Sequence, residues 1–140
     1  MNEVAGKSIR SVKEKPKTGI EDLPNLEYTR IKKAVINGNK IKTSYWKIIL
    51  YQMIDEAGAK DESIRLDELT GLSIKRGCVE GKGFSYREKA NVSVPPATAN
   101  QSAEAIIKIA RYLKYEGVIE YRRRNVPQTS RRKREGSVIL

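Results

Sequence analysis

Residues 117–140 read GVIEYRRRNVPQTSRRKREGSVIL and hold seven Lys and Arg residues between Arg122 and Arg134, with no acid among them. Short apolar runs flank this charge, Val118-Ile119 before it and Val138-Ile139-Leu140 after it. A loose cationic tail would bind polyanions without selection, whereas a charged loop between paired strands would be one part of a recognition surface. Three apolar residues at the end of a free tail would have nothing to pack against. We therefore predict a basic loop held between two strands.

The composition limits the classes of protein to which the chain can belong. Its 140 residues suffice for one domain of ordinary size, and 39% of them are hydrophobic. No apolar run approaches the roughly 18 residues needed to cross a bilayer, and the N-terminus lacks the apolar stretch of a secretory signal. The single cysteine, Cys78, excludes an internal disulfide. We expect a protein of the cytoplasm or nucleoid, or of the nucleus in a eukaryote, with no membrane partner.

The sequence also argues against catalysis. It contains no histidine, which removes the commonest general base and the commonest zinc ligand. Cys78 alone can build neither a structural zinc site nor a Cys–His nucleophile pair. Acidic pairs at 55–56, 61–62 and 67–68 are groups of the kind that hold Mg²⁺ in nucleases, but such pairs are more often solvated surface. We expect a protein that is not an enzyme, with no catalytic residues, no cofactor and no metal.

The net charge of +11 is concentrated at the two ends of the chain. Residues 1–43 carry ten basic and five acidic side chains, residues 44–117 carry eleven and ten, and residues 118–140 carry seven and two. Clustered basic charge is typical of proteins that bind nucleic acids. The basic stretches lack the Trp, Phe and Leu face of a membrane-surface helix. Nucleic acid is therefore the expected partner.

The first 60 residues divide into three predicted segments. Residues 1–22 contain few apolar residues and indicate a disordered basic arm. Residues 23–41 fit either a helical stripe or a hairpin turning at Asn37-Gly38, and we favour a short helix ending there. Residues 43–58 predict the first core helix, because their apolar side chains recur at three- and four-residue spacing: Trp46, Ile49, Leu50, Met53 and Ile54.

The remaining segments end in the strongest helical signal of the chain. A short strand is expected at 64–66, a short helix at 66–72, and an irregular insertion with a small hairpin at 73–97. Thr98, Asn100 and Ser102 are candidate N-caps for a helix that closes at Gly117. Its apolar face is Ile106, Ile109, Ala110 and Leu113, and its polar face is Gln101, Glu104, Lys108, Arg111 and Tyr115.

The segment IARYLKYEGVIEYRRR at 109–124, followed by a basic loop and GSVIL, resembles the junction between recognition helix and wing in bacterial winged helix-turn-helix regulators. The matching residues are Leu113, Gly117, Val118, Ile119 and Glu120. Gly117 would permit the chain reversal with a positive φ. The resemblance implies a mainly α fold with a small β-hairpin wing, a winged-helix-like DNA-binding domain over 23–140. The insertion at about 73–97 departs from the family, most members of which have only a short turn there.

By this resemblance the last helix enters the major groove of double-stranded DNA and the arginine-rich wing lies on phosphates or in the minor groove. Asn100 and Gln101 have amides that pair with adenine, and Lys108 or Arg111 would reach guanine or phosphate. The expected function is non-enzymatic regulation of transcription or replication. The implied DNA-binding residues are Thr98, Asn100, Gln101, Lys108, Arg111, Arg122, Arg123, Arg124, Arg131, Arg132, Lys133 and Arg134.

Other functions fit the same residues. An RNA-binding or ribosome-associated structural protein is the first alternative, and the DNA-binding part of a nuclease or mobile-element system is the second. The helix face could instead be an ordinary solvated surface, and RRKR at 131–134 a nuclear localisation signal. Tyr45, Trp46 and Tyr51 on the first core helix could form a protein interface, which makes a homodimer possible, although we expect Trp46 to pack in the core.

Overall fold

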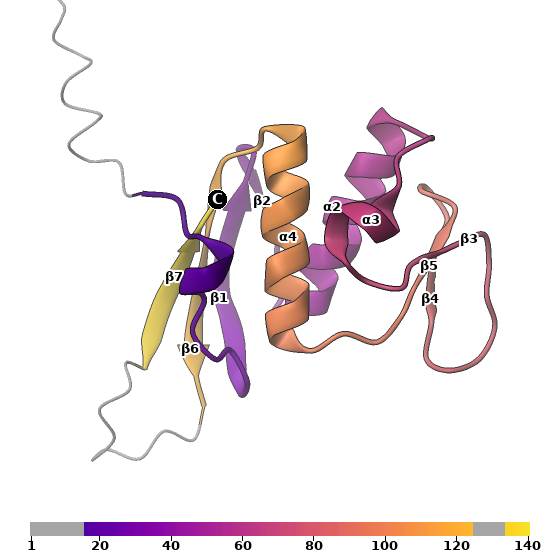
Figure 1. The fold of residues 1–140 in the computed structure, drawn as a ribbon. Coiled ribbons are helices and arrows are strands. Elements are labelled where there is room, and N and C mark those ends of the chain that lie inside the picture. The colour runs from indigo at the N-terminus through magenta and orange to yellow at the C-terminus, as the bar shows by residue number, and fades with distance from the viewer. Residues whose placement is uncertain (1–15, 125–133) are drawn as a thin grey trace, which may run out of the picture.

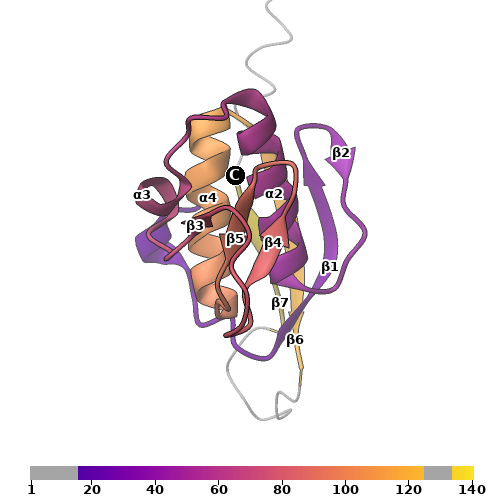
Figure 2. The same cartoon turned by 90° about the vertical axis from the view of Figure 1, so that its right-hand side faces the viewer.

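The structure is a computed structural model that describes residues 16–124 and 134–140. Helix α4 (Ala99–Leu113) lies between a four-stranded antiparallel sheet and helix α2 (Trp46–Lys60) (Figure 1). A small three-stranded sheet lies on the side of these helices that faces away from the main sheet (Figure 2). The described chain is therefore a layered α/β structure with α4 at its centre.

The first long strand, β1 (Thr29–Ile36), occupies the segment in which we favoured a helix. Asn37 and Gly38 both have a positive φ, 53° and 80°, and form the two-residue turn to β2 (Asn39–Lys40). The pairing register shifts between Ile31 and Lys33, and this bulge places Ile31 and Ala34 on the same buried face. A bulged strand thus acquired the three-residue spacing of a helix, which explains the error.

The main sheet has the strand order β2-β1-β6-β7, and β6 (Gly117–Arg123) pairs with β7 (Glu135–Ile139) in antiparallel register. Val118 lies opposite Ile139, so the apolar runs on each side of the basic loop are paired as expected. Residues 125–133 of that loop lie outside the described residues. The predicted fold class, a mainly α winged helix-turn-helix with a small hairpin wing, is wrong. The described residues form seven strands in two antiparallel sheets.

The hydrophobic core surrounds α4 on both sides. One side of α4 packs on the inward face of the main sheet, and the other packs on α2. The predicted helices at 43–58 and 98–116 are confirmed, and Trp46 is buried. Burial covers most of the circumference of α4, at Ser102, Ala103, Ala105, Ile106, Ile107, Ile109, Ala110 and Leu113. Only a narrow stripe of α4 is left for solvent.

Both ends of α4 are set by local residues. Thr98 is the N-cap of a complete capping box: its hydroxyl accepts from the Gln101 N–H, and the Gln101 side chain accepts from the Thr98 N–H. At the other end Lys114, with a φ of 61°, provides the left-handed residue that terminates the helix. Gly117 does not have the positive φ that we expected. A Cβ there would lie 2.3 Å from the Val35 carbonyl oxygen, so Gly117 is needed for close approach to β1.

The segment between α2 and α4 forms the outer layer. Helix α3 (Leu66–Thr70) confirms the short helix, whereas no strand forms at 64–66. Strands β3 (Lys75–Arg76), β4 (Ser85–Arg87) and β5 (Val92–Val94) form the small sheet in the order β3-β5-β4, and β4 and β5 are the predicted hairpin. This layer reaches α2 through a contact in which Gly58 lies against Ala90.

The described part of the N-terminal segment is attached to the main sheet. The Thr18 N–H donates to the Ile139 carbonyl at 2.8 Å, and the Ile139 N–H donates back to the Thr18 hydroxyl at 2.8 Å. The 3-10 helix η1 (Ile20–Asp22) follows, and Ile20 packs against the core. The arm was expected to extend to residue 22, but the folded part already includes Thr18. Residues 1–15 lie outside the described residues.

Candidate nucleic-acid interface

The polar residues at the start of α4 hold the fold together. Thr98 and Gln101 form the capping box described above. The Asn100 side chain accepts from the Leu26 N–H at 2.8 Å and donates to the Pro24 carbonyl at 2.8 Å. Its amide therefore joins α4 to the chain before β1 and is not aimed at a partner.

The two cations of α4 lie further along its exposed stripe. Arg111 is exposed and donates to the Thr18 carbonyl at 3.3 Å, and the Lys108 amine lies beside Gly71 at the end of α3. Figure 1 shows η1 and α3 on either side of α4, and each carries two acids in its first turn. Glu104 lies on the stripe itself. The exposed face of α4 therefore has mixed charge.

The arginines at the end of β6 differ sharply in environment. Arg122 is exposed and forms an ion pair with Glu135 at 3.3 Å, and Arg124 is exposed at the end of the strand. Arg123 is only 9% exposed and donates to the Asn25 carbonyl. Arg134, before β7, is exposed, while Arg131, Arg132 and Lys133 lie outside the described residues. Arg123 is thus a structural residue between two exposed ones.

We expect Arg123→Ala to lower the free energy of unfolding by about 2 kcal/mol, because it leaves the Asn25 carbonyl without its charged donor. Denaturant titration measures this loss. Arg122→Ala is the matched control, since an exposed ion pair contributes at most about 1 kcal/mol. Equal losses in the two variants would contradict a structural role for Arg123.

A larger basic surface lies mostly outside the residues that the sequence predicted to bind DNA. Between Glu27 and Asp55 the chain has six Lys and Arg residues and no acid. The fold places this run on β1, the β1–β2 hairpin and the start of α2. The beginning of β1 lies next to the end of β6, where β6 pairs with the start of β7. We call this surface the basic edge: Arg30, Lys32, Lys33, Lys40, Lys42, Lys47, Arg122, Arg124 and Arg134.

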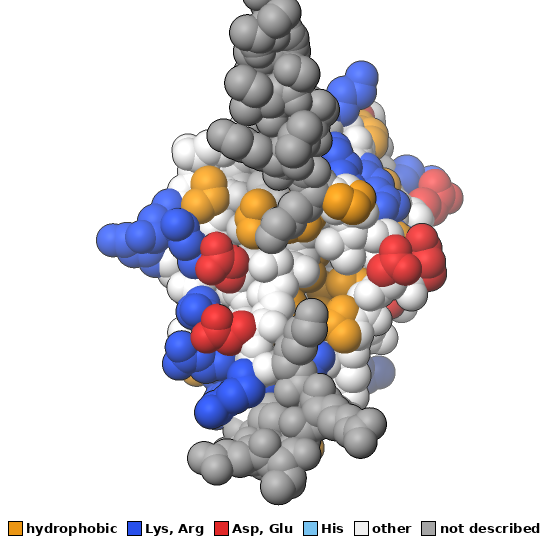
Figure 3. Space-filling model, turned by 90° about the vertical axis from the view of Figure 1, so that its left-hand side faces the viewer, with side chains coloured by type: hydrophobic (Ala, Val, Ile, Leu, Met, Phe, Trp, Pro, Cys, Tyr) orange, Lys and Arg blue, Asp and Glu red, His pale blue; other side chains and the backbone are white. Residues whose placement is uncertain are grey.

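The basic edge follows one side of the main sheet. Figure 3 shows Lys and Arg side chains gathered along the side formed by β1 and β2, with acids both among them and on the opposite side. Glu135 is an acid within the basic edge, and its pKa is lowered by the Lys32 ammonium, which donates to it at 3.1 Å, and by Arg122. This carboxylate offsets part of the charge of Lys32 and Arg122. Most of the surplus therefore comes from the hairpin and α2.

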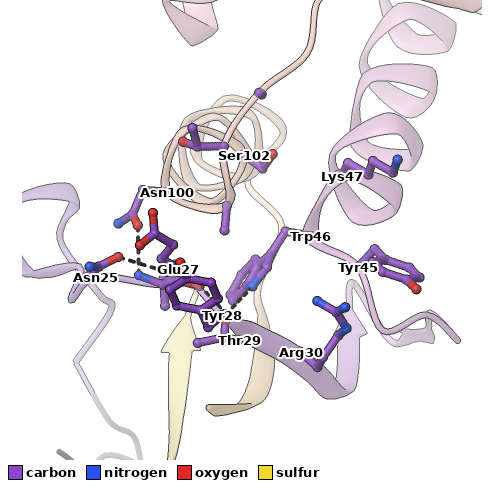
Figure 4. A pocket seen from close by; sticks show the side chains of 14 residues that line it. Asn25, Glu27, Tyr28, Thr29, Arg30, Tyr45, Trp46, Lys47, Asn100 and Ser102 are labelled. Carbon is purple, nitrogen blue, oxygen red and sulfur yellow. Dashed lines mark hydrogen bonds between the residues drawn. The ribbon is translucent and has the colours of Figure 1, made fainter. Parts of the chain in front are cut away.

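A cleft of about 510 Å³ opens at one end of the basic edge, between the turn before β1, the start of α2 and the start of α4. Figure 4 shows Trp46 directed into it, where the indole N–H donates to the Thr29 hydroxyl at 2.9 Å. Ala99 adds an apolar wall, and the side chains of Leu26 and Ser102 are buried beneath the cleft. The floor is thus largely apolar and is held by a buried hydrogen bond.

The rim of the cleft is aromatic and charged. Tyr28 is 63% exposed and Tyr45 is 50% exposed, so both present large aromatic rings to solvent. The Arg30 guanidinium lies 4.9 Å from the centre of the Tyr45 ring. Lys47 adds a second cation, and Glu27 is the only carboxylate among the lining residues. Tyr45 is also the N-cap position of α2 and makes no capping hydrogen bond through its side chain.

Comparison with known proteins identifies no relative. No family model matches the chain, and no curated protein or solved structure is significantly similar to it. None of the helices in residues 16–124 and 134–140 combines the length and the apolar character that a membrane span requires. Within the same residues, no three His, Cys, Asp or Glu side chains gather closely enough to ligate a metal. Inferences about function therefore rest on the basic edge and the cleft.

Proposed function

We propose that the protein binds DNA without catalysing a reaction, and that the basic edge holds the phosphates. The observation that carries this proposal is the run from residue 28 to residue 54, which has six cations and no acid. Its cations lie on β1, on β2 and the segment after it, and at the start of α2. Phosphate contacts from Lys and Arg supply most of the affinity of non-specific DNA binding. Regulation of transcription or replication is the role that we attach to this binding.

The start of α2 supports the same assignment. Helix N-termini carry a partial positive charge and N–H groups without intrahelical partners, and anions bind there. Tyr45 does not cap α2 through its side chain, and Lys47 lies in the first turn. A phosphate near Lys47 would gain from the ammonium and from the helix end together.

The proposal differs from the sequence-based one in the surface that faces DNA. The amides of Asn100 and Gln101 already serve the fold, and the exposed stripe of α4 lies between the acids of η1 and α3. Those acids would repel the phosphates on either side of a major groove entered by α4. The basic edge keeps a positive surplus, because its nine cations outnumber the acids beside it, Glu120 opposite Lys33 and Glu135. We therefore propose it as the main contact surface.

The expected result is salt-sensitive binding to duplex DNA of random sequence. If about six of the cations of the basic edge contact phosphates, the slope of log affinity against log salt concentration is about −5. A fluorescence anisotropy titration over a salt series measures it. A slope near zero, or no binding at low salt, would remove the proposal.

RNA is the second candidate, and the exposed tyrosines favour it. Sequence-specific RNA recognition mostly stacks unpaired bases on aromatic side chains, and Tyr28 and Tyr45 both offer rings to solvent beside cations. Phosphate contacts alone do not separate the two polymers. Competition of folded RNA against duplex DNA at matched salt decides between them, and stronger binding to RNA would replace the DNA assignment.

A further inference from the structure

We propose that the cleft between the turn before β1, the start of α2 and the start of α4 receives one unpaired nucleobase of a DNA strand whose phosphates lie on the basic edge. This inference rests on the proposed function and gives it a second part, in which the protein recognises a junction between duplex and single strand. Four features carry it: the volume and apolar lining of the cleft, the exposed Tyr28 with its strained backbone at the rim, the cations beside the cleft and the position of its one acid.

The size and lining of the cleft suit a flat aromatic ligand. Its volume of about 510 Å³ falls within the roughly 300–1,000 Å³ of small-molecule sites. Ala99 and the exposed rings of Tyr28 and Tyr45 offer apolar surface there, above the buried Leu26 and Trp46. A base stacked within a duplex cannot enter such a recess, because its two faces are already covered. An unpaired base exposes both faces and loses little on entry.

Tyr28 is held at the rim in an unfavourable backbone conformation. Its φ is 63°, in the left-handed region that bulky residues rarely adopt, yet its ring is 63% exposed. Its carbonyl accepts from the Arg124 N–H at 2.8 Å, and the Thr29 N–H donates to the Leu26 carbonyl at 3.1 Å, so the turn is fixed on both sides. Burial does not compensate this strain, and such strain is often found at functional sites.

The charges around the cleft match a nucleotide. Arg30 lies over the Tyr45 ring at 4.9 Å, and Lys47 lines the same side, so the phosphate of a bound nucleotide would lie there. Glu27 would repel that phosphate, but its carboxylate accepts hydrogen bonds from the amino group of a base. Interleaved aromatic rings and cations of this kind form the stacking surfaces of single-strand binders.

The test compares two DNA probes and two tyrosine variants. One probe is a blunt duplex and the other is the same duplex with a short unpaired overhang. Tyr28→Asn removes the rim ring and introduces a residue that tolerates the left-handed conformation, so the variant retains its fold. Tyr86→Asn is the control, because Tyr86 is 40% exposed on β4, in the layer away from the main sheet.

We expect the unaltered protein to prefer the overhang probe. Tyr28→Asn should weaken binding of that probe by about 5- to 150-fold, which is the effect of losing one base stacked on an aromatic ring. Binding of the blunt duplex should change by less than about twofold, and Tyr86→Asn should change neither. Trp46 is the only tryptophan and lies in the cleft, so its emission should change with the overhang probe alone.

The outcomes separate this inference from the proposed function. Salt-sensitive binding of both probes with equal affinity, or an unchanged overhang affinity in Tyr28→Asn, would overturn the cleft inference and leave DNA binding standing. Absence of binding to either probe would overturn both. Tighter binding of the same overhang made of RNA would overturn the assignment of the cleft to a DNA strand. A thermal melt of each variant shows that lost binding is not lost folding.

Discussion

Replacement of Lys33, Lys40 and Lys42 by glutamine in one protein is expected to weaken binding to duplex DNA by about 500-fold at about 0.1 M salt. The three side chains are exposed on β1, β2 and the segment that follows, within the acid-free run. Each phosphate contact contributes about 0.9 to the log–log salt slope, so the loss of three of about six contacts changes the slope from about −5.4 to about −2.7. If the variant and the original bind equally at about 1 M salt, their affinities differ by about 2.7 logarithmic units at about 0.1 M salt, which is about 500-fold.

A matched control separates the position of the charge from its amount. Lys75, Lys82 and Lys89 are also exposed, but they belong to the segment of the small sheet. Their triple replacement by glutamine lowers the net charge from +11 by the same three units. We expect the salt slope of this variant to stay within about half a unit of the original. Equal losses in the two triple variants would show that total charge, and not the basic edge, determines binding.

The position of the basic edge could have been predicted in part from the sequence. The absence of any acid between Glu27 and Asp55 is visible without a structure, but a division of the chain at residue 43 splits that run in two. Its arrangement on one side was not visible, because it depends on β1 pairing with β6 about 90 residues later. That pairing brings Arg30 opposite Arg122. Short-range patterns carry no information on such a contact.

The roles of the α4 residues could not be read from spacing alone. An amphipathic helix with polar residues at its start fits a recognition helix, and the same pattern fits a helix capped and bonded at its start. Asn100 is committed to Leu26 and Pro24, more than 70 residues earlier in the chain. Similarly, Arg122 and Arg123 are adjacent and chemically equal, yet the alternation of β6 buries only the second. The alternation of side chains along β6 therefore decided which arginine is structural.

The strongest effect on stability is expected from Gly117→Ala, which should lower the free energy of unfolding by about 3 kcal/mol. A Cβ at this position would lie 2.3 Å from the Val35 carbonyl oxygen and 2.8 Å from the Ile36 Cα. Both atoms belong to backbone, so β1 and β6 would have to move apart at the point where their ladder ends. Denaturant titration measures the loss.

Two further variants test whether space or conformation requires this glycine. Gly38 has a φ of 80° and nothing within 4 Å of its added Cβ, so Gly38→Asn should be tolerated, because asparagine adopts left-handed turns. Gly117→Asn should be at least as damaging as Gly117→Ala, because the larger side chain meets the same backbone. If Gly117→Asn instead retains the stability of the original, the requirement is conformational and the close approach of β6 to β1 does not constrain the residue. The basic edge depends on the close approach of β6 to β1 at Gly117. This approach belongs to the ladder that also places Arg30 opposite Arg122.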